Sequence, residues 1–101
     1  MSPLAQRFAE ADRTLIGEGS IKVRLAEAYS THLADLTEAE FPAGLRRDFA
    51  DLQSALSRVT PFGNESRVRA SVQKMSTDQA GDQAAVVLRL YVELVNTLER
   101  A

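Results

Sequence analysis

The chain has 101 residues, of which 45% are hydrophobic and 26% are charged, and its formal net charge is -2. This length is typical of one domain, so we expect residues 1–101 to form a single unit. The absence of cysteine excludes a disulfide scaffold, a cysteine-based zinc site and a cysteine nucleophile. An ordinary hydrophobic fraction with a small net charge argues against a disordered chain.

The sequence favours neither secretion nor membrane insertion. The opening segment MSPLAQR lacks the basic and apolar regions of a secretory signal. The longest uninterrupted apolar run covers only residues 84–88, whereas a membrane-spanning helix needs about 20 apolar residues. We therefore expect a cytoplasmic protein with no membrane contact.

Hydrophobic residues recur at helical spacing along the first half of the chain. Ser2 and Pro3 are a typical helix start, and the pattern after them predicts a helix over 3–16. Gly17 and Ser20 then supply the end of that helix and the cap of the next, which we expect over 21–36.

The segment between 37 and 59 contains a proline that divides it. Thr37 and Glu40 fit a capping box, but Pro42 follows too soon for a long helix, so we expect a single helical turn. Apolar residues spaced four and three apart then predict a helix over 43–59. This spacing fits a coiled-coil-like seam as well as a core face.

Residues 66–75 are ambiguous. Val68, Ala70 and Val72 alternate as in a strand, whereas Val68, Val72 and Met75 have helical spacing. We favour a short helix over a strand, because an isolated strand would leave its backbone groups unpaired unless a second subunit supplied a partner.

The last predicted helix, over 78–99, begins at a second capping box formed by Ser76 and Gln79. Its main apolar stripe consists of Ala80, Ala84, Val87, Leu88, Tyr91, Leu94, Val95 and Leu98. Val86, Leu90 and Val92 lie outside this stripe on both flanks. A helix that is apolar over most of its circumference is normally buried on several sides, either at the centre of a bundle or at a subunit interface.

These elements predict an all-α fold, a compact four- or five-helix bundle. A chain this short has little material to cover its last helix. Val86, Leu90 and Val92 are therefore our candidates for an interface, and we expect a homodimer or a protein partner.

The sequence contains no convincing catalytic constellation, so we expect neither a cofactor nor a metal. The Gly17–Lys22 segment lacks phosphate-loop spacing and is better explained as a helix end followed by a cap. His32, the only histidine, lies on an apolar helix face without a metal-ligand motif, which favours a hydrogen-bonded residue at the edge of the core over a pH-responsive contact. Paired carboxylates such as Asp48 and Asp51 fit a solvated helix surface better than acid–base chemistry.

The basic residues are unevenly distributed, and a small cluster of them lies in the segment 66–75. Arg67, Arg69, Ser71 and Lys74 are candidates for anion binding, and a helix would place Arg67, Ser71 and Lys74 on one face. Nucleic-acid binders usually present a wider basic surface, and the segment that follows is acidic, so nucleic acid is not the favoured partner. A solvated basic face is the simpler interpretation.

A resemblance adds to this picture. At GEGSIKVRL (17–25), AY (28–29), FP (41–42) and VQKMS (72–76), the chain resembles small bacterial all-helical proteins to which no activity is assigned. The resemblance implies a helical fold and a bacterial cytoplasmic setting, and it transfers no functional residue.

The favoured hypothesis is therefore a non-enzymatic interaction or accessory module that self-associates through the apolar surface of its last helix. The alternative is a binder of a phosphate-bearing ligand or RNA through Arg67 to Lys74. An enzyme would need a metal or cofactor that the sequence does not indicate.

Overall fold

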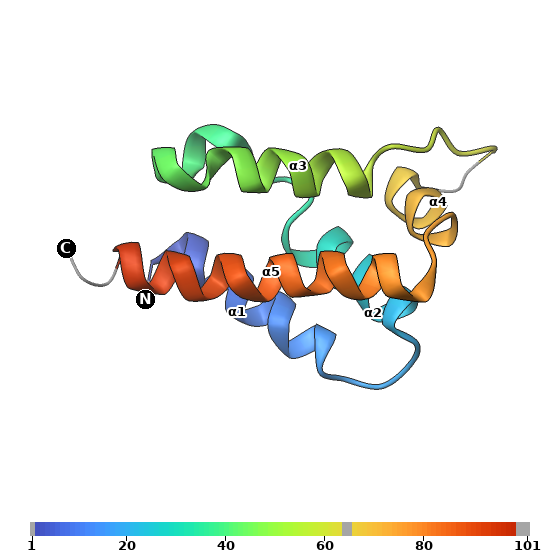
Figure 1. Cartoon of the computed structure of the whole chain (residues 1–101), viewed down its shortest axis with the longest axis horizontal. Coiled ribbons are helices and arrows are strands. Elements are labelled where there is room, and N and C mark those ends of the chain that lie inside the picture. Colours follow the sequence, from blue (N-terminus) through green and yellow to red (C-terminus); the bar gives the residue numbers. More distant parts are fainter. Residues whose placement is uncertain (1, 64–65, 99–101) are drawn as a thin grey trace.

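In a computed structural model of the chain, residues 2–63 and 66–98 are described (Figure 1). They form five α-helices and two single turns of 3-10 helix, with no strand in those two ranges. The helices are α1 (Pro3–Leu15), α2 (Ile21–His32), α3 (Arg46–Leu56), α4 (Arg67–Gln73) and α5 (Thr77–Leu98), and the 3-10 turns are η1 (Glu38–Glu40) and η2 (Ala43–Leu45). The predicted all-α class is confirmed, and α4 resolves the ambiguous segment as a short helix.

Serine side chains begin most of these helices. Ser2, Ser20 and Ser66 each accept a hydrogen bond from the backbone N–H three residues later, at 3.1–3.2 Å. At the start of α5, Ser76 and Gln79 exchange two such bonds, of 3.0 and 2.8 Å, as the predicted capping box requires. Each cap satisfies a free N–H of the first helical turn and typically contributes about 1 kcal/mol.

Two helices are shorter than their apolar patterns predict. Helix α2 ends at His32 rather than at residue 36, yet Leu33 and Leu36 in the following turn are still buried. The helix can end there because Arg7 donates a 3.1 Å hydrogen bond to the carbonyl of His32, which satisfies one of its last acceptors. The apolar spacing after His32 therefore reflects the burial of Leu33 and Leu36 and not a continuation of the helix.

Helix α3 begins at Arg46 and ends at Leu56, whereas the pattern predicts a helix over 43–59. The 3-10 turn η2 occupies the predicted first turn. At the other end, the backbone N–H of Val59 bonds to the hydroxyl of Ser71 on α4 instead of to a carbonyl of its own helix.

An aromatic cluster joins the N-terminal helix to α3. Phe8 on α1 and Phe41 in the connecting turn meet edge to face, with ring centroids 5.8 Å apart. Phe41 also stacks on Phe49 of α3 at 4.3 Å. All three rings are almost fully buried, so Phe41 anchors the turn between α2 and α3 to the core.

The long helix α5 occupies the middle of the molecule. It packs against α1, α2 and α3, and Figure 1 shows it running between α1 and α3. Its fully buried residues are Ala80, Val87, Leu90 and Leu94. The core face is therefore rotated from the predicted stripe: Leu90 lies inside it, whereas Leu88 is 52% exposed. Within the described residues, no helix is long and apolar enough to cross a membrane.

Candidate functional site

The side of α5 that the other helices leave uncovered carries two large apolar residues. Leu88 and Val92, one turn apart, are 52% and 50% exposed. Ala85, Arg89 and Glu93 are exposed beside them. We call these five residues the outer face of α5; at about 3.6 residues per turn they form one continuous strip.

The structure separates the three predicted interface residues. Val92 lies on the outer face of α5, Val86 is half-buried and packs against the core, and Leu90 is 0% exposed. The choice of Leu90 as an interface candidate outside the core stripe is therefore wrong, because its side chain is enclosed by the protein's own helices. Leu88 takes its place on the surface, although its spacing assigned it to the core stripe.

The four predicted anion-binding residues do not converge on one point. Ser71 is 3% exposed and accepts a 2.9 Å hydrogen bond from the backbone N–H of Val59. Arg67 reaches the carbonyl of Ser57 at 3.5 Å. Arg69 projects from a different side of α4, into a groove shared with α2. Only Ser71 and Lys74 line a common pocket.

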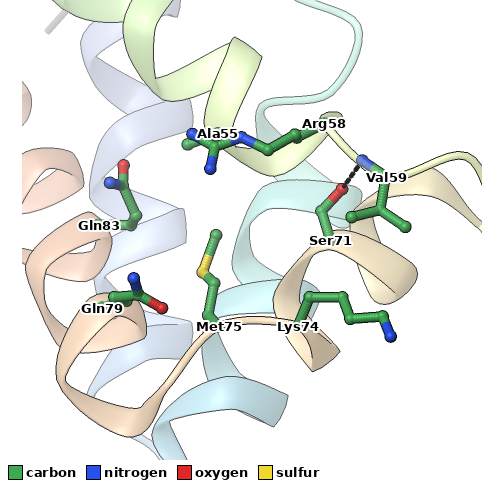
Figure 2. Close-up of a pocket in the computed structure, with 8 residues that line it drawn as sticks. All are labelled: Ala55, Arg58, Val59, Ser71, Lys74, Met75, Gln79 and Gln83. Carbon is green, nitrogen blue, oxygen red and sulfur yellow. Dashed lines mark hydrogen bonds between the residues drawn. The ribbon is translucent and has the colours of Figure 1, made fainter.

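That pocket, of about 190 Å³, lies where the end of α3, helix α4 and the start of α5 meet (Figure 2). Its polar lining residues are Arg58, Ser71, Lys74, Gln79 and Gln83. Its apolar lining residues are Ala55, Val59 and Met75. Arg58, Gln79 and Gln83 were not among the predicted binding residues, because they lie on segments far apart in the sequence and no local motif links them.

A wider groove of about 890 Å³ lies between α2 and α4. Lys22 and Glu27 of α2 and Arg69 of α4 line it, so its charges are mixed. The ammonium group of Lys22 donates a 3.0 Å hydrogen bond to the carbonyl of Gln73, which ties the two helices together. Lys22 therefore stabilises the packing of α2 against α4 and is not part of a phosphate-binding loop.

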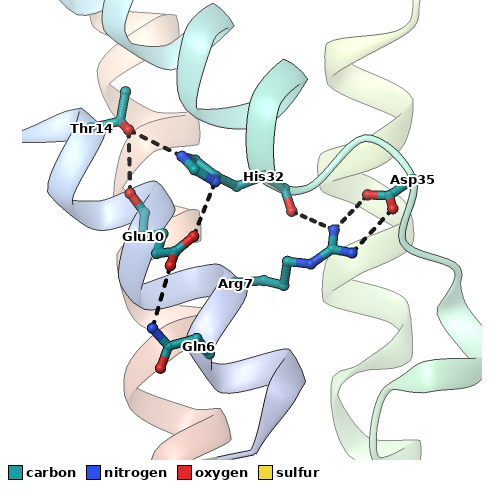
Figure 3. A network of polar contacts seen from close by, with 6 residues as sticks. All are labelled: Gln6, Arg7, Glu10, Thr14, His32 and Asp35. Atoms are coloured by element: carbon teal, nitrogen blue, oxygen red, sulfur yellow. Dashed lines mark hydrogen bonds and ion pairs between the residues drawn. The ribbon is translucent and has the colours of Figure 1, made fainter.

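His32 belongs to a polar network between α1 and the end of α2 (Figure 3). Its Nδ1 atom lies 3.5 Å from a carboxylate oxygen of Glu10, and its Nε2 atom lies 3.4 Å from the hydroxyl of Thr14. Nearby, Arg7 pairs with Asp35 at 2.6 and 3.2 Å, and its hydrogen bonds hold the pKa of the Asp35 carboxyl below its usual range. The network joins two helices of the same chain, which matches the predicted hydrogen-bonded histidine at the edge of the core.

Asp12 on α1 is the most perturbed carboxylate. Both of its oxygens are buried, and neither has a hydrogen-bond partner among the described residues. Burial raises its pKa to about 6. Among residues 2–63 and 66–98, no second titratable group is hydrogen-bonded to it.

The described residues contain no group of three His, Asp or Glu side chains arranged to hold a metal ion. Asp48, one of the paired carboxylates, instead lies 3.6 Å from the guanidinium of Arg89 on α5. Compared with protein-family models, with curated proteins and with solved structures, the chain matches none of them.

Proposed function

We propose that the protein is a non-enzymatic helical interaction module that forms a homodimer through the outer face of α5. The observation that carries the proposal is the half-exposed pair Leu88 and Val92 on a helix whose other sides pack against α1, α2 and α3. Covering this pair would remove apolar surface from water, which favours association at roughly 25 cal/mol per Å².

The order of residues along the strip suits a second copy of the same chain. In an antiparallel pair of α5 helices related by a two-fold axis, Leu88 of each protomer would meet Val92 of its partner. Arg89 and Glu93 flank this contact, so the same arrangement sets each Arg89 near the Glu93 of the partner subunit. Opposite charges therefore meet twice across one self-complementary surface.

The first experiment measures mass. Two apolar side chains per protomer make a small interface, so we expect a dimer that dissociates on dilution, and light scattering after gel filtration should span about 10 µM to 1 mM. We expect the wild-type mass to rise towards twice the 11.1 kDa of one chain. A monomeric mass over the whole range would overturn the proposal.

Variants then locate the interface. The double variant Leu88→Lys/Val92→Lys should stay folded by circular dichroism and remain monomeric at every concentration, since both positions are already half in water. The matched control is Ile16→Lys, which changes an 82% exposed apolar residue at the end of α1 and should dimerise normally. If both variants dimerise like the wild type, α5 is not the interface.

A charge exchange tests the antiparallel geometry. Arg89→Glu and Glu93→Arg should each weaken the dimer, because each sets like charges against each other across the two-fold axis. Combining both substitutions in one chain should restore it. The melting temperature of the monomer, measured at low concentration, separates this effect from the loss of the contact between Arg89 and Asp48 within one chain. Failure of the combined variant to recover would rule out the antiparallel pairing.

A further inference from the structure

The pocket between α3, α4 and α5 contains a cation with no partner in the described part of the chain. Arg58, which follows the end of α3, makes no ion pair and no hydrogen bond to any described residue. In Figure 2 its guanidinium lies over the pocket, on the side that faces Gln83 of α5. A guanidinium has five donors in a planar fork, the geometry that matches a carboxylate or a phosphate.

Two neutral side chains with donor groups line opposite sides of the pocket, Ser71 on α4 and Gln79 on α5 (Figure 2). Ser71 is 3% exposed, and its oxygen accepts the bond from Val59, while its own O–H has no acceptor among the described residues. Gln79 uses its side-chain oxygen to accept a 2.8 Å bond from the backbone of Ser76, and its NH₂ group donates to no described residue. A buried hydroxyl that retains an unused donor is uncommon in a protein interior.

The charge balance of the pocket favours an anion. Lys74 lines the rim with Arg58, and among the described residues no Asp or Glu side chain lines the pocket. Figure 2 shows that the stem of Lys74 borders the pocket while its ammonium group extends outward, so Lys74 adds positive potential to the entrance. The wall formed by Ala55, Val59 and Met75 is apolar.

From these observations we infer that the pocket binds a small organic anion, with its carboxylate or phosphate group on the guanidinium of Arg58 and a short apolar part against Met75. The volume of about 190 Å³ suits a compact molecule better than a whole nucleotide or a peptide. The inference goes beyond the proposed dimer and does not depend on it, since Leu88 and Val92 do not line this pocket.

The test is a titration followed by two-dimensional ¹H–¹⁵N NMR at constant ionic strength, with butyrate and inorganic phosphate as separate probes and chloride as the reference salt. We expect saturable shifts of the backbone signals of Val59 and Ser71 and of the side-chain amide signals of Gln79 and Gln83, with a Kd in the millimolar range for such small probes, about 1–10 mM. Saturation by butyrate alone identifies a carboxylate site, and saturation by phosphate alone identifies a phosphate site. The absence of saturable shifts with either probe up to about 50 mM overturns the inference.

Three variants show whether the pocket is responsible. Arg58→Gln should weaken binding about tenfold or more, and Lys74→Gln only a few-fold, because its ammonium group lies at the entrance. Both residues are exposed, so their replacement should leave the helical circular dichroism unchanged. The matched control is Arg69→Gln, which removes an exposed cation from the other side of the same helix and should bind the probe as the wild type does. Equal affinity of the Arg58 and Arg69 variants would mean that the ion binds only by general surface charge, and would refute the site.

Discussion

The backbone N–H of Val59 donates a 2.9 Å hydrogen bond to the side chain of Ser71, twelve residues further along the chain. Ser71 is the one buried polar residue in the described core, and it lies on the short helix α4. The bond therefore anchors a seven-residue helix to the end of α3, and both of its residues line the pocket between α3, α4 and α5. A helix of this length would not be stable in water by itself.

We expect Ser71→Ala to lower the free energy of unfolding by about 1–2 kcal/mol, because the N–H of Val59 would lose its partner. Urea unfolding followed by circular dichroism measures this change. Ser30→Ala, at an exposed position of α2, is the control and should change stability by less than about 0.5 kcal/mol. Equal stability of the two variants would show that the bond contributes nothing.

Neighbouring leucines on α5 should respond in opposite ways. Leu90→Ala should cost about 2–5 kcal/mol, since Leu90 is 0% exposed and truncation leaves a cavity. Leu88→Ala, at a 52% exposed position, should cost less than about 1 kcal/mol in the monomer. Thermal unfolding at low protein concentration compares them. A larger loss for Leu88 than for Leu90 would contradict the observed rotation of the helix.

Asp12 should make stability fall as the pH rises. Its folded-state pKa is about 6, above the 3.8 of an unperturbed aspartate, so between these values the folded protein binds more protons than the unfolded chain. The favourable contribution of Asp12 to the free energy of unfolding is complete below about pH 4 and is lost as the pH rises through 6. With solvent screening taken into account, we expect a loss of about 1–2 kcal/mol across this interval.

The variant Asp12→Asn, which cannot ionise, should remove that part of the pH dependence and be more stable than the wild type at pH 7. Chemical unfolding at several pH values between 4 and 7 provides the measurement. Asp51→Asn, at an exposed site on α3, should keep the wild-type profile. A profile for Asp12→Asn that overlays the wild type would show that Asp12 titrates normally.

Alanine substitutions at two glycines should change the stability of the protein in opposite directions. Gly19 has a φ of 101°, a conformation that L-residues rarely adopt, so Gly19→Ala should destabilise the protein by about 1 kcal/mol or more. Gly81 lies inside α5, and a Cβ there would meet nothing within 4 Å. Gly81→Ala should therefore stabilise the protein by about 0.5–1 kcal/mol through helix propensity. Differential scanning calorimetry compares the two, and a shift of the same sign in both would contradict this assignment.

Local features of this protein follow from its sequence alone. The caps at Ser2, Ser20 and Ser76 mark helix starts because their hydrogen bonds involve residues only three positions away. The all-α class follows in the same way, from periodicity. Residues 66–75 have a pattern that fits a strand as well as a helix, and the structure resolves this favoured but open choice as α4.

Tertiary contacts decided the rest. The face of α5 that enters the core depends on how α1, α2 and α3 surround it, because a helix that is apolar on nearly every side has no single stripe to specify its rotation. The spacing predicts Leu88 in the core and Leu90 outside the core stripe, whereas the structure buries Leu90 and exposes Leu88. Likewise, the ends of α2 and α3 depend on bonds from Arg7 and to Ser71, which are distant in sequence. The pocket in Figure 2 brings Arg58, Gln79 and Gln83 together only where α3, α4 and α5 meet, and no local sequence pattern predicts this arrangement.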